Sequence, residues 1–368
     1  MKIFWLIITI FVSIAWGDAN MDKEIYNYYQ NWKQTYLIGE KSGTYRVATD
    51  KKDKHRTVSE GQGYGMLITA LIQEDKEAKK LFDGLWRFSR AHPSKIAKDL
   101  MSYEVPEKKE AIDSAFDGDA DIAYALILAD KRWGSKGAVN YKKEALKVID
   151  AIWKHTIGKN SFIPLLGDWV DPKGKKYNQF TTRTSDFMLD NFKAFYKFTG
   201  DTKWLKVVHV TQKALLDVQN PQTGLVPDFI KYNFKTKKFE AVEEGFLEQY
   251  DGFYYYNACR VPFRIGVDAL SHNDPTSKKI VKKMATWSKL VSKNTPTNLK
   301  SGFKLDGKVI GDYFSIVFLA PFGVAAKSCD TNWSKKIYSC VINRHENYYE
   351  DSVTLLSLMA MNGAFKQH

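Results

Sequence analysis

Apolar residues recur every three or four positions through nearly the whole chain, which is the spacing of one face of an α-helix. The pattern predicts twelve helices, and Gly-, Asn- and Pro-containing breakers such as Gly200-Asp201 and Asn220-Pro221 separate them. The predicted helices span residues 21–37, 59–72, 76–91, 119–132, 139–156, 184–199, 203–218, 252–270, 276–291, 311–326, 333–343 and 349–362.

Two intervals, 157–183 and 219–250, are long and carry no periodic pattern. Long loops in a compact helical domain are more often functional than idle. No linker, low-complexity segment or fixed-period repeat interrupts the chain, so the sequence predicts an all-α fold in one uninterrupted domain. Twelve helices fit either a helical array or a closed double ring of six inner and six outer helices, and periodicity alone does not choose between them.

Residues 1–17 have the pattern of a secretory signal peptide. Lys2 precedes an apolar run that ends at a small-x-small cleavage site, residues 15–17 (Ala-Trp-Gly). The run is about 13 residues long, and roughly 20 are needed to span a bilayer. We therefore expect signal removal to leave one domain over residues 18–368, secreted or periplasmic, without a membrane anchor and monomeric.

The net charge of +13 and the pI near 9.3 raise the question of a nucleic-acid partner. The lysines, however, are scattered along helices and loops and form neither one tract nor a recognised binding motif. This distribution favours a solvated basic surface, and we expect no nucleic-acid partner.

The chain has three cysteines. Cys329 and Cys340 lie in one region and would be able to pair in an oxidising compartment, which would leave Cys259 over. Three buried free thiols explain the sequence equally well. No Cys-x-x-Cys spacing exists, which excludes zinc ribbons.

The first of three stretches in which carboxylates gather is residues 57–66, Thr-Val-Ser-Glu-Gly-Gln-Gly-Tyr-Gly-Met. Its glycines permit close approach of chain or ligand. It lacks the third glycine of a dinucleotide fingerprint and the Gly-Lys-Ser/Thr of a phosphate loop. Glu60 therefore stands at a predicted helix start either to stabilise the helix N-terminus or to serve a chemical role, and both interpretations stay open.

The second stretch is residues 114–123, Ser-Ala-Phe-Asp-Gly-Asp-Ala-Asp-Ile-Ala. Its spacing begins like a calcium loop, but Ile122 replaces the required glycine and Leu128 the chelating glutamate, so calcium is not expected. Asp117 and Asp121 lie four residues apart, on one helix face. Three acids at one helix start exceed what a helix cap needs. Their like charges repel one another, and such repulsion is the arrangement that perturbs pKa values in active sites.

The third stretch, residues 243–251, ends the second long interval and contains Glu243, Glu244 and Glu248. From sequence alone it is most typical of a solvated acidic turn. Nucleophilic and metal-dependent motifs such as Gly-x-Ser-x-Gly and His-Glu-x-x-His are absent, and we expect no metal or cofactor. Carboxylates remain as the catalysts, and two of them, one protonated and one ionised, suffice to hydrolyse a glycosidic bond.

These residues resemble glycoside hydrolase family 8. Residues 57–66 match the family's Ser-Glu-Gly-x-Gly-Tyr-Gly-Met segment, whose Glu is the general acid. Residues 115–133 are similar to its Ala-Ser/Thr-Asp-Ala/Gly-Asp signature, with Phe116 where Ser or Thr is usual. Further matches lie at residues 166–169, 183–188, 258–262, 320–322 and 349–358, so the resemblance covers about residues 30–360. It implies an (α/α)6 barrel.

The resemblance departs from the family's best-known branch at the general base. That branch has Asp in an Asp-Ala-x-Arg motif, where this chain has Asn257, which is no useful proton acceptor. A second branch, of chitosanases, lichenases and some endoglucanases, is similar in having Asn there and takes a Glu from the preceding loop. Residues 246–248 (Phe-Leu-Glu) resemble that segment, which implies Glu248 as the base, with Glu243 or Glu244 as alternatives.

The implied reaction is a single displacement with inversion. Glu60 would protonate the leaving oxygen, and Glu248 would deprotonate a water held between carboxyl groups roughly 6.5–9.5 Å apart. Asp117 would hydrogen-bond the distorted sugar, and Arg260 and Asp186 would position the sugar or the water. The residues expected to bind substrate are Asp168, Trp169 (by stacking), Arg183, Asp186, Tyr256, Asn257 and Arg260.

The expected partner is a β-linked polysaccharide. A protein of charge +13 repels the polycation chitosan, which favours endo-cleavage of β-1,4 bonds in neutral, lichenan-like or cellulose-like β-glucan. Two alternatives stay open: a chitosanase of the same family, and a glycan-binding protein that has lost hydrolysis.

Overall fold

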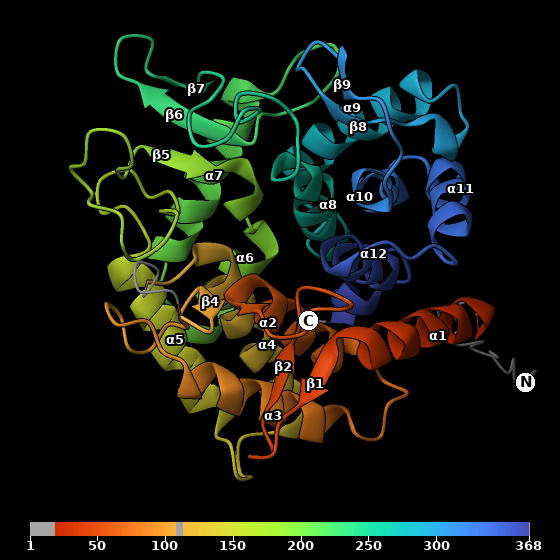
Figure 1. Cartoon of the computed structure of the whole chain (residues 1–368). Coiled ribbons are helices and arrows are strands. Elements are labelled where there is room, and N and C mark those ends of the chain that lie inside the picture. Colours follow the sequence, from red (N-terminus) through yellow and green to blue (C-terminus); the bar gives the residue numbers. More distant parts are fainter. Residues whose placement is uncertain (1–18, 108–112, 368) are drawn as a thin grey trace, which may run out of the picture.

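The computed structural model describes residues 19–107 and 113–367, so the expected signal peptide lies outside the described residues. Within that part of the chain, all twelve predicted helices are present (Figure 1). They are α1 (Ala19–Tyr36), α2 (Ser59–Leu71), α3 (Ala78–Ala91), α4 (Phe116–Trp133), α5 (Tyr141–His155), α6 (Leu189–Thr199), α7 (Lys203–Val218), α8 (Val261–Ser271), α9 (Pro275–Val291), α10 (Ile316–Lys327), α11 (Thr331–Val341) and α12 (Tyr348–Met361).

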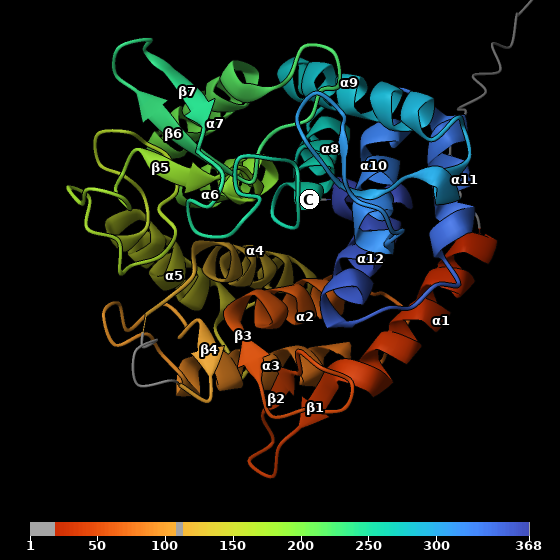
Figure 2. The ribbon, with the colours of Figure 1, turned by 45° about the horizontal axis from the view of Figure 1, so that its top comes forward.

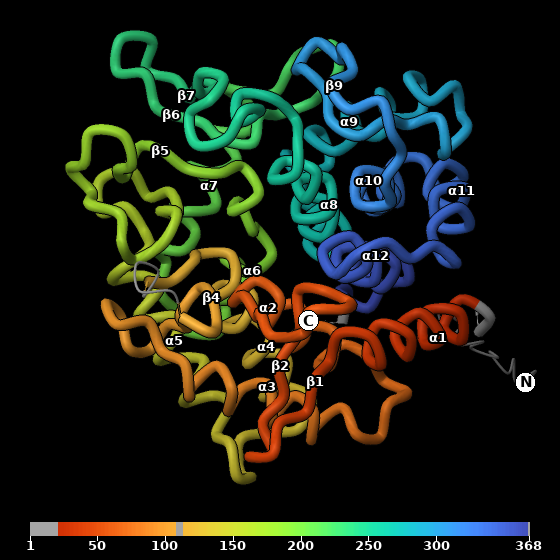
Figure 3. Tube along the Cα trace, viewed as in Figure 1, coloured from red at the N-terminus to blue at the C-terminus, as the bar shows by residue number. Residues whose placement is uncertain are grey.

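The helices form a closed double ring, which confirms the expected (α/α)6 barrel. The even-numbered helices α2, α4, α6, α8, α10 and α12 each pack on the next one, and α12 packs on α2 and closes the inner ring (Figure 2). Each odd-numbered helix lies outside and packs on an inner neighbour. The chain path in Figure 3 ends with α12 beside α1, so the two ends of the fold meet.

The division into inner and outer helices follows from their side chains. Inner helix α10 is apolar on every face, and all residues from 316 to 326 are buried. A helix that is hydrophobic all round requires neighbours on all sides. Outer helix α3 is amphipathic instead: Leu81, Leu85 and Phe88 are buried, whereas Arg87 is exposed.

Glycines let α2 and α4 approach closely. A Cβ atom on Gly118 would lie 2.5 Å from the carbonyl carbon of Ser59, and one on Gly63 would lie 2.9 Å from the Gly118 oxygen. A Cβ on Gly61 would lie 2.6 Å from the Tyr348 hydroxyl. The glycines of the 57–66 segment therefore serve helix packing, which sets how the first turns of α2, α4 and α12 meet.

Nine short strands supplement the helices in the described residues. Two hairpins join β1 (Leu37–Gly39) to β2 (Tyr45–Val47) and β8 (Ser301–Phe303) to β9 (Val309–Gly311), and β3 (Thr57–Val58) pairs with β4 (Glu104–Val105). The largest sheet is antiparallel with order β5-β6-β7, from β5 (Thr181–Arg183), β6 (Phe229–Asn233) and β7 (Lys238–Ala241). The two long non-periodic intervals thus contain a sheet that the sequence did not predict.

Three predicted helix starts are wrong. The helices expected from 184, 252 and 311 begin instead at Leu189, Val261 and Ile316. Residues 309–311 form β9, the second strand of the β8-β9 hairpin. In the other two cases the preceding segment donates N–H groups to tertiary partners: Thr184 begins a 3₁₀ turn and binds Asp228, and residues 254–258 bind Phe303 and Asp228. Local periodicity does not report such long-range bonds.

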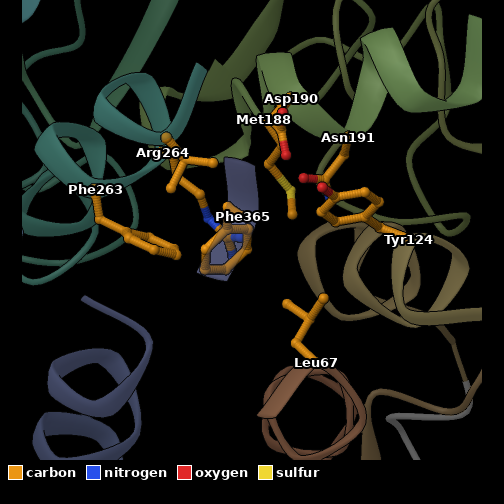
Figure 4. Close-up of a pocket in the computed structure, with 9 residues that line it drawn as sticks. Leu67, Tyr124, Met188, Asp190, Asn191, Phe263, Arg264 and Phe365 are labelled. Atoms are coloured by element: carbon orange, nitrogen blue, oxygen red, sulfur yellow. The ribbon is translucent and has the colours of Figure 1, made fainter. Parts of the chain in front are cut away.

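The barrel interior is filled by side chains. A cavity of about 10 Å³, large enough for one water, lies among Leu67, Tyr124, Met188, Asn191 and Arg264, with Phe365 beside it (Figure 4). No substrate passes through such a space. No helix among the described residues is long and apolar enough to cross a membrane.

Cys329 and Cys340 do not form a disulfide, since the three cysteines are free thiols. Cys329 precedes α11 and Cys340 lies in its last turn, so about nine residues of helix separate them by roughly 14 Å. A disulfide requires Cα atoms within about 7 Å.

Candidate active site

The first turns of the inner helices bring the candidate residues together. Glu60 is the second residue of α2, and Asp117 is the second residue of α4. Asp186 ends the 3₁₀ turn η1 (Thr184–Asp186) before α6, and Arg260 ends η2 (Ala258–Arg260) before α8. The positive ends of these helix dipoles favour carboxylates here.

Arg260 is the centre of this cluster, and its side chain is only 3% exposed. Its Nη1 donates to Oε2 of Glu60 at 2.7 Å and to Oδ2 of Asp117 at 2.9 Å. Its Nη2 donates to Oγ of Ser185 and to Oδ1 of Asn257, both at 3.1 Å. One buried guanidinium therefore fixes two carboxylates and an amide in a common geometry.

Arg183 supplies a second positive charge. Its Nη2 lies 3.4 Å from Oδ1 of Asp117, and its Nε donates to Oδ2 of Asp186 at 3.0 Å. Asp117 is thus held between two arginines, one on each carboxylate oxygen.

The cluster gives its carboxyl groups different proton affinities. Burial raises the pKa of Glu60, and the negative charge of Asp117 adds to that effect against the opposing influence of Arg260. Burial also disfavours the charged form of Asp117, but Arg183 and Arg260 outweigh it and hold its pKa below the usual range. Burial raises the pKa of Asp186 to about 6. Of the two carboxyl groups, Glu60 is therefore the more readily protonated and Asp117 the more readily ionised.

Glu60 is also the carboxyl group that reaches outward. Its side chain is 19% exposed, against 3% for Asp117 and 0% for Asp186. The Tyr348 hydroxyl at the start of α12 donates to its Oε1 at 3.1 Å. A ligand above the inner ring would therefore meet Glu60 before the other acids.

The remaining acids of the 114–123 segment are compensated inside the barrel. Asp121 forms a bidentate pair with Arg264, at 2.8 and 2.6 Å. Asp119 is buried and accepts a bond from the Met101 N–H at 2.8 Å, and burial raises its pKa well above the usual value. Arg264 therefore balances the charge of Asp121, and burial favours the protonated form of Asp119.

Glu248 lies outside this buried cluster. Its side chain is exposed, and its backbone N–H donates to Oδ2 of buried Asp251 at 2.6 Å. The loop is anchored by Phe246, whose buried ring lies 5.5 Å from Tyr177 and 6.3 Å from Phe229. Glu248 is thus presented to solvent from a loop that is fixed at both sides.

The other predicted binding residues differ in availability. Trp169 is 40% exposed, and its ring stands edge-on to Tyr177 at 5.3 Å. The Tyr256 hydroxyl hydrogen-bonds the Tyr313 hydroxyl at 2.9 Å. The carboxylate of Asp168 instead accepts bonds from Ser94, Ala97 and Ser114, so it ties loops together within the protein.

Comparison with known proteins identifies the family of this chain. The sequence profile of glycosyl hydrolases family 8 matches residues 5–363. The chain belongs to glycosyl hydrolase family 8. It is 39% identical to an endoglucanase of Bacillus sp. (strain KSM-330) over 94% of this chain and 77% of that protein. It is 38% identical to a beta-glucanase of Niallia circulans over 94% of this chain and 86% of that protein.

A solved structure of similar fold is the apo beta-1,3-1,4-glucanase of Paenibacillus sp. X4. The TM-score is 0.89 at 37% identity, over 94% of this chain and 92% of that one. The barrel of this family 8 protein and that of the relative therefore follow the same course.

The sequence did not single out Asp228, which organises the turn before α8. This buried residue precedes β6, and its carboxylate accepts bonds from the N–H groups of Tyr255 (2.8 Å), Asn257 (3.0 Å) and Ala258 (2.7 Å). It also accepts a bond from the Asn257 side chain at 3.3 Å. Burial raises the pKa of Asp228 to about 7 against the opposing effect of these donors. Asp228 thus orients Asn257 toward Arg260.

The sequence did not single out Tyr348 either, although its hydroxyl donates to Glu60. The Tyr-Tyr pair at the start of the last predicted helix is the sequence signal that could have found it.

In the described residues no group of three or more His, Cys, Asp and Glu side chains is arranged to hold a metal ion.

We predict that Asp228→Asn lowers both stability and activity. An amide offers one acceptor oxygen where the turn needs two, which leaves a buried N–H unpaired at a cost of about 1–3 kcal/mol. Thermal unfolding should show a lower Tm, and kcat should fall more than KM changes. Asp306→Asn is the matched control, because exposed Asp306 accepts a single backbone bond from Lys308. An equal Tm for both variants would contradict the role of Asp228.

Proposed function

We propose that this chain is a secreted, monomeric, inverting endo-β-glucanase that hydrolyses β-1,4 bonds in neutral β-glucan. The observation that carries the proposal is Glu60, a partly exposed carboxyl group with a raised pKa, set beside an ionised and buried Asp117. The endoglucanase, beta-glucanase and beta-1,3-1,4-glucanase among its relatives support the same substrate class.

Glu60 acts as the general acid. Arg260 donates to its Oε2, so the transferable proton resides on Oε1. The Tyr348 hydroxyl beside Oε1 can donate or accept, and it therefore contacts both the protonated and the ionised form of Glu60. Protonation of the leaving oxygen from this position completes bond cleavage.

Glu248 acts as the general base, as the resemblance to the branch with Asn at the usual base position implies. Asn257 has both amide groups engaged, with Oδ1 accepting from Arg260 and Nδ2 donating to Asp228. Glu248 is the exposed carboxylate of a loop anchored next to that turn, since Asp251 binds both the 247–248 backbone and, through its carbonyl oxygen, Phe229. It would activate water on the sugar face opposite Glu60.

Asp117, Arg183, Asp186 and Arg260 position the sugar at the cleavage site. Asp117 is held ionised, so it accepts strong hydrogen bonds from the hydroxyls of a distorted ring. Trp169 stacks on sugar at the edge of the site, because its ring is 40% exposed.

The charge of the cluster favours a neutral substrate over chitosan. Two arginines balance Asp117, while burial keeps protons on Glu60 and Asp186 more readily than in water. The buried cluster therefore offers no excess negative charge for a polycation, and the net charge of +13 repels one.

We predict the release of reducing ends from barley β-glucan and carboxymethylcellulose, and not from chitosan. Glu60→Gln should reduce kcat on barley β-glucan by about 10²–10⁴-fold, since the amide cannot donate the acid's proton. Activity on chitosan alone would make the chain a chitosanase. Glycan binding without hydrolysis of any β-glycan would make it a binding protein.

A second prediction concerns pH. Activity needs protonated Glu60, so kcat/KM falls as pH rises through the pKa of Glu60. Asp117→Asn removes a negative charge that raises this pKa and leaves Arg260 to pair with Glu60 alone. The alkaline limb of the residual activity should therefore move to lower pH by about one unit. Asp119→Asn, on the same helix, is the control. If the alkaline limb of Asp117→Asn stays at the same pH or moves to higher pH, Asp117 does not raise the pKa of Glu60.

A third prediction separates the candidate bases. Glu248→Gln should lower kcat by about 10²–10⁴-fold with KM changed much less, because the base acts on water rather than on substrate binding. Glu243→Gln and Glu244→Gln are matched controls from the same loop, and Glu243 already pairs with Lys231. Proton NMR of the first product should show the α-anomer. Loss of activity in a control variant, and not in Glu248→Gln, would move the base to that residue.

A further inference from the structure

A groove beside the β5-β6-β7 sheet is separate from the buried cluster. It encloses about 410 Å³ between the 175–181 segment, β6 and the loop around Phe246. In Figure 1 this sheet lies at the rim of the molecule, outside the inner helical ring. The proposed reaction does not use this groove.

Three aromatic rings, one of them exposed, line one side of the groove. Phe234, in the turn between β6 and β7, is 65% exposed. Its ring lies 4.9 Å from Phe180 and 5.1 Å from Tyr232, edge to face in both cases. The half-buried rings of Phe180 and Tyr232 thus support the exposed ring of Phe234, which presents an apolar face to solvent, as is typical of a binding surface.

Lysines surround these rings. The 171–176 segment has three lysines and one aspartate, and the 231–243 segment has four lysines and two glutamates. Glu243 pairs with Lys231, and Glu240 accepts bonds from Asn233 and Thr236. Lys175 and Lys176 line the groove, and no carboxylate of the described residues lies within ion-pair distance of either. The groove is therefore both aromatic and strongly positive.

The groove continues from the proposed glycan site. Phe246 lines it, two residues before Glu248. Phe246 contacts Tyr177, and Tyr177 contacts the exposed Trp169. A row of rings thus leads from the proposed stacking residue Trp169 to the groove. This continuity favours a polysaccharide over another polyanion.

We propose that this groove is a second polysaccharide site, selective for acidic glycans. The carboxylates of such a chain would pair with Lys175 and Lys176, while the apolar faces of its sugars would stack on Phe234 and Tyr232. The choice of a glycan rests on the proposed function, whereas the preference for negative charge rests on the lysines alone. The site would hold the enzyme on acidic polysaccharide while the separate cluster cleaves neutral glucan.

The test is affinity electrophoresis of the full chain in gels containing polygalacturonate, which is α-linked and acidic and so is no substrate for the proposed activity. Migration should be retarded at low salt and recover in about 0.5 M NaCl, because salt screens exposed charges. Lys175→Ala/Lys176→Ala and Phe234→Ala should each weaken binding about tenfold. Lys282→Ala/Lys283→Ala removes the same charge from the exposed face of α9 and should not weaken it.

Two kinds of result would overturn the proposal that the groove is an acidic-glycan site. No retardation, or an equal loss in the α9 control, would show that no built site exists. If gels containing single-stranded DNA retard the protein as strongly as polygalacturonate does, and the same substitutions abolish that retardation, the groove is a general polyanion surface and not a glycan site. Hydrolysis of barley β-glucan by all three variants should stay within about twofold of the parent. If the unsubstituted protein binds polygalacturonate but does not hydrolyse β-glucan, the proposed function is refuted. The preference of the groove for acidic chains would still hold.

Discussion

The structure depends on one buried cation, Arg260, shared between Glu60 and Asp117. A buried guanidinium is tolerated when opposite charges surround it, and breaking such a buried ion pair by removing one partner typically costs about 3–5 kcal/mol. Ser185 and Asn257 take further N–H groups of the arginine. The same interaction decides the protonation of the site. It stabilises the anion of Asp117, while burial leaves Glu60 the more readily protonated group.

Arg260 can reach both carboxylates because the first turns of the inner helices converge at one end of the barrel. Residues far apart in sequence reach one point only if these helices pack closely, and Gly118 and Gly63 permit that approach where any Cβ would collide. Arg264 and Asp121 repeat the pairing one layer deeper, so the cluster stands on a second buried ion pair rather than on apolar side chains. The sequence motifs around Glu60 and Asp117 are therefore as much packing signals as chemical ones.

The sequence predicted features that local patterns report, and missed those that depend on partners elsewhere in the fold. Helical periodicity located all twelve helices, because each buries a stripe or a whole surface, and the motif resemblance singled out Glu60 and Asp117, which the structure brings together at Arg260. Periodicity failed at the start of α10, where a hairpin strand precedes the helix, and at the starts of α6 and α8, where backbone N–H groups bond distant partners. Asp228 was invisible for the same reason: its role is defined by N–H groups 27 to 30 positions away, and nothing in its local sequence reports them.

Asp228 also gives a physical reason for Asn257. The amide of Asn257 accepts from Arg260 through Oδ1 and donates to Asp228 through Nδ2, so it satisfies a cation and an anion at once. A carboxylate there would face Asp228 at about the 3.3 Å that now separates donor and acceptor. Like charges so close cannot both ionise, and one would take up a proton. A carboxylate at position 257 would therefore share a proton with the buried Asp228 that shapes the turn, whereas Asn257 needs none, and under the proposed mechanism proton acceptance falls to the exposed loop carrying Glu248.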